Sequence, residues 1–435
     1  MLATLGHVMF GLFGLAVLIG IAFLFCNNKR RVDWKLIGTG VIMQILFATA
    51  VLKLPGGREV FDAIATGFVK LLDYVHQGSA FIFGSLLDSE HVGYIFAVQV
   101  LPTIVFFASL TGVLYHLGVM QLVVKWMAWV ITKAMRVSGA ETTSVCASVF
   151  IGQTEAPLTI KPYIGRMTQS ELMTVMIGGM AHIAGSVMAA YVSMLGGHDP
   201  VRQLFFAKHL LTASIMAAPA TMMLAKLLVP ETGEPLTRGT VKIEVEKNTA
   251  NIIDAAANGA ADGLRLAMNV GAMLLAFVAL IALLNAPIQW LGTAHWAGGS
   301  LNAWLSAHAG HPVALSLQTL FGWLLAPVAW LIGVPWQDAT LVGSLIGEKV
   351  VLNEFVAYAD LSTHLDKLLP QSQLIATYAL CGFANFSSIA IQLGGIGGLA
   401  PERRQDLARL GLRAVLGGSL ATFMTATIAG VLETL

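Results

Sequence analysis

The hexapeptide Gly152-Gln153-Thr154-Glu155-Ala156-Pro157 places an amide, a hydroxyl and a carboxylate inside a strongly apolar chain. Its glycine and proline interrupt helical hydrogen bonding and leave backbone groups free. The surrounding residues 138–168 are too polar and too short for two ordinary membrane spans, and too apolar for a free loop. We therefore expect a re-entrant hairpin whose tip faces a polar cavity, where Glu155 is a functional residue. The alternative is a structural ion pair between Glu155 and Lys161.

Composition places the rest of the chain in a bilayer. Of 435 residues, 56% are hydrophobic and only 11% are charged, whereas soluble domains carry about 25% charged residues. So little charge excludes a water-soluble enzyme. Apolar segments near the ~20 residues that a membrane helix needs predict eight spans: 8–26, 36–52, 92–114, 172–197, 205–225, 268–290, 374–398 and 414–432.

The distribution of basic residues predicts the orientation. No Lys or Arg precedes the first apolar run, and Lys29–Arg31 follow it, which favours a retained first span over a cleavable signal. Eight spans then put both termini outside and 18 of the 25 Lys and Arg residues in cytoplasmic loops, as the positive-inside rule requires. The net charge of +1 gives no reason to expect a nucleic-acid partner, and the three distant cysteines indicate neither a disulfide nor a metal site.

Two further segments complete the organisation. Residues 119–137 mix basic and tryptophan side chains, which predicts a helix in the cytoplasmic interface, at its simplest a strut. The 36 residues 230–265 carry ten charges and predict a cytoplasmic linker between two halves, although one continuous eight-span body is the alternative. We expect five divisions. Residues 1–118 would form the N-terminal scaffold spans, 119–229 the interfacial helix with the first hairpin and the following spans, and 230–265 the linker. Residues 266–337 would form a scaffold span with an external interfacial helix, and 338–435 the second hairpin with the last two spans.

The two halves share short matches in the same order, which predicts an inverted repeat. The first half meets the membrane from inside and the second from outside. Chance similarity between apolar sequences is the alternative explanation. The matched pairs are Ile151-Gly152-Gln153 with Ile346-Gly347-Glu348, Gln169-Ser170-Glu171-Leu172 with Gln371-Ser372-Gln373-Leu374, and Gly179-Met180-Ala181-His182 with Gly382-Phe383-Ala384-Asn385.

A second hairpin is expected at 338–370, and it carries further polar residues. Glu354 has apolar residues on both sides, so we expect it to face the same cavity as the first hairpin. Glu348 and Lys349 are close enough to pair with each other. The expected fold is an all-α polytopic membrane protein with eight transmembrane helices, two opposed re-entrant hairpins and an inverted-repeat transport domain.

The helix after the second hairpin adds three side chains to the site. Asn385 and Ser388 lie three apart, which predicts that they share one helix face, and Phe383 lies nearby. Together with the first hairpin, the site would contain two carboxylates, two amides and two hydroxyls beside an aromatic ring. This chemistry suits a neutral, hydroxyl-rich ring compound, because a carboxylate accepts paired hydroxyl protons.

Three motifs resemble those of the concentrative nucleoside transporters: Gly-Gln-Thr-Glu-Ala-Pro at 152–157, Asn-Glu-Phe-Val-Ala-Tyr at 353–358 and Gly-Phe-Ala-Asn-Phe-Ser-Ser at 382–388. The resemblance extends over almost the whole chain and implies a nucleoside substrate, a homotrimer and elevator-like movement of a transport domain. It also implies the roles of individual residues: Gln153, Thr154 and Glu155 would bind the base, Val187 and Phe383 would pack on the ring, and Glu354, Asn385 and Ser388 would hold the ribose.

The chain departs from the family pattern at the coupling ion. The resemblance implies that sodium-coupled members bind the ion with two backbone carbonyls and two side chains. The carbonyls correspond to those of Ile151 and Ile183, and the side chains, an Asn and a Ser or Thr, stand at the positions of Ser148 and His182. Both side chains differ here. Imidazole is a poor sodium ligand and titrates near pH ~6.5, so we favour coupling to protons over sodium. The alternative is that His182 only donates a hydrogen bond to a carbonyl in its helix packing.

The expected function is secondary active nucleoside uptake by ion symport across a bacterial cytoplasmic (inner) membrane, without other cofactors. The chain has no Gly-x-x-x-x-Gly-Lys-Ser/Thr phosphate loop that would support direct drive by ATP. An intramembrane hydrolase is the first alternative, but the chain lacks His-Glu-x-x-His and Gly-x-Ser-x-Gly motifs. A nucleoside channel without coupling is the second, and hairpin tips that meet at mid-membrane would close its pore.

Overall fold

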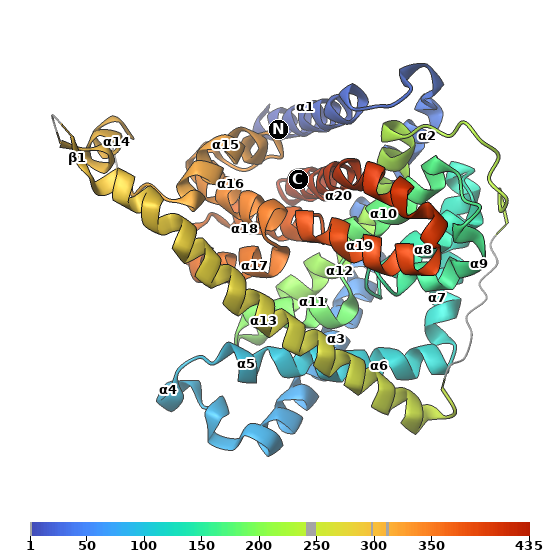
Figure 1. The fold of residues 1–435 in the computed structure, drawn as a ribbon, viewed down its shortest axis with the longest axis horizontal. Helices are drawn as coiled ribbons and strands as arrows, with labels where there is room; N and C mark the ends of the chain where they lie inside the picture. The colour runs from blue at the N-terminus through green and yellow to red at the C-terminus, as the bar shows by residue number, and fades with distance from the viewer. Residues whose placement is uncertain (1, 241–248, 297–298, 310–312) are drawn as a thin grey trace.

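The computed structural model describes residues 2–240, 249–296, 299–309 and 313–435, and these residues are almost entirely helical (Figure 1). The first half of the chain contains α1 (Leu2–Leu24), η1 (Lys29–Arg31), α2 (Trp34–Leu52), α3 (Pro55–Phe83), η2 (Gly84–Leu87), α4 (Ser89–Val92), α5 (Phe96–Gln99), α6 (Leu101–His116), α7 (Val119–Met135), α8 (Gly139–Ser148), η3 (Ala156–Ile160), α9 (Lys161–Ile164), α10 (Gln169–Ala181), α11 (Gly185–Gly196) and α12 (Pro200–Leu228).

The second half begins with the longest helix and contains one short β-hairpin. Its elements are α13 (Ile252–Thr293), β1 (His295–Trp296), β2 (Gly299–Ser300), α14 (Leu301–Ala309), α15 (Leu317–Leu331), α16 (Trp336–Val351), α17 (Glu354–His364), η4 (Leu365–Lys367), α18 (Pro370–Leu380), α19 (Phe386–Leu399), η5 (Pro401–Arg403) and α20 (Arg404–Glu433). The strands pair antiparallel. In Figure 1, α13 runs as a long diagonal along one side of the molecule, packed against α6.

Seven segments of the described chain are long and apolar enough to cross a membrane, and each overlaps one expected span. They are Leu5–Leu24, Trp34–Leu52, Phe96–His116, Gln169–Gly196, Pro200–Leu228, Ile252–Thr293 and Pro401–Glu433. The eighth expected span, 374–398, is divided between α18 and α19. The helix α3 was not expected, and α13 begins at Ile252, well before the expected span 268–290.

Three of these segments form the centre of the fold. Gln169–Gly196, Pro200–Leu228 and Pro401–Glu433 are 94%, 89% and 89% buried within the chain, whereas Ile252–Thr293 is only 17% buried. The helix α20 contacts α10, α12 and α18, so the two halves of the sequence share one core. The outer helices α1, α2, α6 and α13 expose their remaining apolar surface, as expected where lipid replaces water as the surroundings.

Two helices of the core are broken. The chain leaves helical conformation between α10 and α11, at His182–Ala184, and again between α18 and α19, at Cys381–Asn385. The breaks touch, because a Cβ added at Gly382 would lie 2.8 Å from the Met180 carbonyl oxygen. Gly382 has φ of 151°, a conformation that glycine adopts far more readily than other residues. Each half thus contains one broken helix, although Gly179–Ala181 are helical and their expected partners Gly382–Ala384 are not.

In each half, the broken helix follows a pair of helices that a non-helical tip connects. In the first half, α8 ends at Ser148 and the chain resumes as the 3-10 helix η3 at Ala156, with Gly152–Glu155 of the hexapeptide between them. In the second half, α16 and α17 are separated only by residues 352–353. Before this second pair, α15 and α16 meet at a bend of 116°. Both tips therefore bring non-helical backbone toward the breaks in the core helices.

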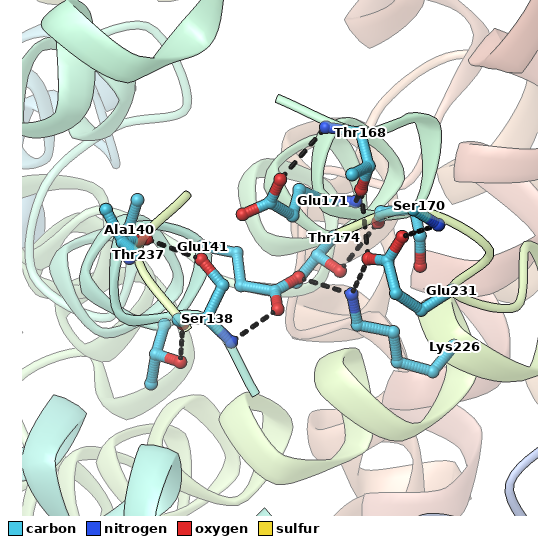
Figure 2. Close-up of polar contacts among 12 residues, drawn as sticks. Ser138, Ala140, Glu141, Thr168, Ser170, Glu171, Thr174, Lys226, Glu231 and Thr237 are labelled. Carbon is cyan, nitrogen blue, oxygen red and sulfur yellow. Dashed lines mark hydrogen bonds and ion pairs between the residues drawn. The ribbon is translucent and has the colours of Figure 1, made fainter. Parts of the chain in front are cut away.

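A buried ion cluster fixes the start of the first pair (Figure 2). The Lys226 ammonium lies 2.8 Å from the Glu141 carboxylate and 3.2 Å from that of Glu231. Glu141 also belongs to a capping box at Ser138, and Thr168 donates a hydrogen bond of 2.9 Å to Glu231. The cluster thus joins α8, α10, the end of α12 and the first residues of the linker.

Candidate substrate and ion site

The carboxylate of Glu354 lies at the centre of the candidate site. Glu354 begins α17, whose N-cap Asn353 accepts a hydrogen bond of 2.9 Å from the Val356 amide. The side chain is only 4% exposed, so its oxygens require hydrogen bonds. One oxygen accepts from the Tyr191 hydroxyl at 3.1 Å and the other from the Asn385 amide at 3.0 Å. Two helices, α11 and α19, therefore meet the tip of α17 at this carboxylate.

Asn385 and Ser388 lie close together, but not as two residues on one helix face. Asn385 is the N-cap of α19, and its side-chain oxygen accepts a hydrogen bond of 2.9 Å from the Ser388 amide. The prediction of a shared helix face was wrong because Asn385 is the last residue of the break and α19 begins only at Phe386. This arrangement turns the NH2 group of Asn385 toward Glu354, so capping and carboxylate binding use opposite ends of one amide.

The amide of Gln153 connects the first tip to α19. Its nitrogen donates to the Ser388 hydroxyl at 3.1 Å, and its oxygen accepts from the Gln392 side chain at 3.2 Å. Gln392 also donates to the Met176 carbonyl at 3.0 Å. A Cβ added at Gly179 would lie 2.8 Å from that of Gln153, so α10 can approach the tip only because this residue is glycine. Gln153 and the three predicted ribose-binding residues thus belong to one hydrogen-bonded group.

Thr154 and Glu155 lie at the more open edge of the tip. Thr154 packs against α19, where a Cβ at Gly395 would come within 2.8 Å of its methyl group. Glu155 is exposed, and it makes no ion pair with Lys161 in the part of the chain that the structure describes. The alternative role of Glu155 as half of a structural ion pair therefore has no support. Its carboxylate is free to contact a ligand.

The two predicted ring-packing residues approach the site from different elements. Val187 lies in α11 and is 2% exposed, and Phe383 lies in the break before α19 and is half-buried against the core. Phe383 is two residues from Asn385 and next to Gly382, so the same backbone break positions all three.

The four predicted ion-site residues surround the break between α10 and α11. His182 is 1% exposed, and its Nδ1 lies 2.7 Å from the Gly178 carbonyl oxygen. The Ser148 hydroxyl ends α8 and donates to the Ser144 carbonyl at 3.0 Å. Ile183 is buried and Ile151 half-buried, and a hydrogen bond of 2.9 Å from the Gly185 amide to the Phe150 carbonyl joins their segments. The Nε2 atom of His182 has no hydrogen-bond partner among the described residues.

The expected pair of Glu348 and Lys349 is not formed. The Lys349 ammonium is fully buried and donates to the Ala379 carbonyl at 2.8 Å and the Thr422 hydroxyl at 3.0 Å. Consecutive residues of a helix point about 100° apart, so Glu348 faces another direction. Lys349 joins α16 to α18 and α20 instead.

Sequence reasoning missed Tyr191 and Gln392, which hold Glu354 and Gln153 in place. A signal for each was present. Tyr191 and Gln392 are buried polar side chains in largely apolar helices, and a buried hydroxyl or amide in such a helix must find a partner. The identity of that partner depends on the tertiary packing.

Comparisons with known proteins agree with this geometry. The chain matches the family models described as "Na+ dependent nucleoside transporter N-terminus" at residues 13–86, "Nucleoside recognition" (Gate) at 97–197, and "Na+ dependent nucleoside transporter C-terminus" at 209–430.

Relatives match over nearly the full chain. The nucleoside permease NupC of Helicobacter pylori is 40% identical, with 97% of each chain covered. Sodium/nucleoside cotransporter 1 of Mus musculus is 38% identical, covering 96% of this chain and 63% of its own length. Among solved structures, CNTnw in an inward-facing substrate-bound state is 42% identical with a TM-score of 0.85, covering 98% of this chain and 97% of its own. A CNTnw variant in an outward-facing state gives the same values.

The relatives are transporters and the apolar helices require a bilayer, so this is a membrane-embedded protein and not an enzyme. The broken core helices, the two polar tips and the three family models all lead to one assignment: the chain belongs to the concentrative nucleoside transporter family.

Proposed function

We propose that this protein takes up nucleosides by symport with a cation, with protons favoured over sodium. The observation that carries the substrate assignment is the buried carboxylate of Glu354, which both Tyr191 and Asn385 bind. A carboxylate held in this way can accept two neighbouring hydroxyl protons, which is the pattern that a ribose presents. Ser388, hydrogen-bonded to Gln153, would complete the ribose site.

The base would bind at the first tip. Gln153 can donate and accept hydrogen bonds, and Thr154 and the exposed carboxylate of Glu155 lie beside it. Val187 and Phe383 would pack on the rings. Gln153 now bonds to Ser388, so a bound nucleoside would replace this internal hydrogen bond with bonds to its base and sugar.

The coupling ion would bind at the break between α10 and α11. The family models bear a sodium-dependent name, and the murine relative is named a sodium cotransporter. In this chain, serine and histidine occupy the two side-chain positions, Ser148 and His182. The buried imidazole has one nitrogen beside a carbonyl and the other without a described partner, so it can take up a proton without losing a hydrogen bond. The carbonyls of Ile151 and Ile183 would face the same site.

Transport would follow an elevator-type cycle within a homotrimer of the bacterial inner membrane, with both termini outside. The solved relatives are described in inward-facing and outward-facing states, which supports alternating access. In this chain, the well-buried core helices would move as a unit against α6 and α13, whose faces are largely exposed in the single chain. An exposed apolar face on α13 also supports contact with other subunits.

Uptake into proteoliposomes tests the proposal. The purified protein should accumulate radiolabelled uridine or adenosine, chemically unchanged, when the exterior is acidic and sodium is absent. An absolute sodium requirement would overturn proton coupling but preserve nucleoside transport. Equilibration without accumulation would favour a channel, and conversion of the label to a product would favour an enzyme.

A further inference from the structure

A basic cavity lies away from the substrate site, between α7 and the linker. Its volume is about 820 Å³. Four cationic side chains line it together with two tryptophans, and no carboxylate is among the lining residues. These side chains are Lys125, Lys133, Arg136, Arg238, Trp126 and Trp129.

No described carboxylate neutralises these cations. None of the four side chains forms an ion pair within the described parts of the chain, and the Lys133 ammonium lies 5.0 Å from the centre of the Trp129 ring. Four like charges around one cavity repel each other, so an anion inside the cavity would relieve an unfavourable arrangement.

Backbone contacts bring the two arginines together. Arg136 ends α7 in a left-handed conformation with φ of 56°. Ser138 and Arg238 form an antiparallel bridge, and the Gly139 amide donates to the Thr237 carbonyl at 2.9 Å. The Thr237 hydroxyl also bonds to Ser138 at 2.7 Å (Figure 2).

The ion cluster holds the linker upstream of these contacts. Glu231 binds Lys226 and Thr168, so the chain from Glu231 to Gly239 is fixed at both ends. The position of Arg238 beside α7 is therefore built into the fold.

The aromatic residues indicate which anion fits. Trp126 and Trp129 are 66% and 52% exposed on the same helix as the lysines, and exposed tryptophans beside basic residues are typical of a helix at the membrane interface. A free anion needs only the charges, whereas a phospholipid presents a phosphate to the cations and a glycerol and acyl region to the aromatic rings.

We propose that this cavity binds the headgroup of an anionic phospholipid such as phosphatidylglycerol. The four cations would hold the phosphate region, and the tryptophans would contact the lipid at the level of its glycerol. Because the cavity joins α7 to the linker, a bound lipid would attach both to the membrane surface.

Native mass spectrometry of the purified full-length protein, titrated with dioleoyl-phosphatidylglycerol, tests the proposal. The double variant Lys133→Gln/Arg238→Gln should bind the lipid about 25-fold more weakly, at about fivefold for each basic residue. The control Arg30→Gln/Arg31→Gln removes the same charge from the exposed loop after α1 and should bind as the wild type does. Unchanged thermal stability and nucleoside uptake would show that both variants fold.

Several outcomes would overturn the proposal. Equal weakening in both variants would mean that net charge alone attracts the lipid, and unchanged affinity in the cavity variant would exclude the site. Equal binding of dioleoyl-phosphatidylcholine would exclude recognition of the negative charge. Displacement of the lipid by millimolar inorganic phosphate would identify a small-anion site, and a lower oligomeric mass of the cavity variant alone would assign the cavity to contact with a second copy.

Discussion

The carboxylate of Glu354 combines deep burial with two neutral hydrogen-bond donors, Tyr191 and Asn385. Such a group stabilises the empty site less than an ion pair would, because neither donor neutralises its charge. A ligand with paired hydroxyls can strengthen this arrangement, which is why we propose ribose recognition at this residue.

The substitution Glu354→Gln tests that role. A glutamine keeps the volume but replaces a charged acceptor by a neutral one, and a hydrogen bond to a charged group contributes about 1.5–3 kcal/mol. We expect uridine uptake to fall on the order of 100-fold in kcat/KM, measured in proteoliposomes. Glu348→Gln, which alters another buried carboxylate near the end of the preceding helix α16, is the control and should retain uptake. Normal uptake by the Glu354 variant would remove the ribose assignment.

His182 provides the corresponding test of coupling. If its imidazole carries the proton, His182→Asn should abolish the stimulation of uptake by an acidic exterior, leaving uptake independent of pH between about 5.5 and 7.5. The initial rate of uptake at a series of exterior pH values, without sodium, measures this. Ser148→Ala alters the neighbouring ion-site hydroxyl and should keep the pH response. If His182→Asn keeps it too, the histidine serves only to bond the Gly178 carbonyl.

At the scale of elements, the close contact of the two helix breaks gives a prediction for Gly382. An added Cβ there would lie 2.8 Å from the Met180 carbonyl oxygen, at a backbone φ of 151°. Gly382→Ala should therefore cost about 1–3 kcal/mol and lower the thermal midpoint in detergent. Gly394→Ala is the matched control within α19, where no atom lies within 4 Å of the added carbon. It should be neutral or slightly stabilising, and equal midpoints for both variants would contradict the tight packing of the breaks.

The ion cluster that holds α8 and the linker can be examined by charge removal. Lys226→Met leaves two buried or half-buried carboxylates uncompensated, and breaking a buried pair costs about 3–5 kcal/mol. The double variant Glu141→Gln/Lys226→Met removes the repulsion as well and should recover part of that loss. Thermal denaturation in detergent would measure both. A double variant no more stable than Lys226→Met would show that the cluster contributes through packing and not through charge.

The apolar pattern predicted most of the spans, because lipid imposes a length and a composition on every crossing helix. It did not predict the break at 381–385. Gly382, two residues after the end of α18, is required by its contact with α10 and not by any local signal. The pairing of Ser138 with Arg238 was equally invisible, because it joins residues far apart in the sequence. Glu348 and Lys349 were expected to pair because they are neighbours, and the helix directs them apart.

The whole molecule separates into a buried set of helices and an exposed set. The most apolar 18-residue stretches of the segments containing α10–α11, α12 and α20 are 89–94% buried, and the first segment contains His182, Ile183, Val187 and Tyr191 of the candidate site. The segment containing α13 is 17% buried and packs chiefly on α6. This division is what an elevator cycle would use, because a compact body that carries the substrate can move against a frame without losing its own core contacts.

Accumulation driven by membrane potential is the prediction that belongs to this scale. A neutral nucleoside with one cation moves one positive charge, and each charge is worth about 2.3 kcal/mol per 100 mV. An interior potential of −100 mV, set by potassium and valinomycin, should thus accumulate uridine about fifty-fold at equal pH and without sodium. Liposomes without the protein are the control. A protonophore should abolish the effect, because it lets protons enter until the pH difference balances the potential and no net driving force on the proton remains. A channel for a neutral solute could not exceed equal concentrations at any potential. Accumulation that appears only with sodium would mean that sodium carries the one positive charge in place of the proton. The two carbonyls, Ser148 and His182 would then form a sodium site.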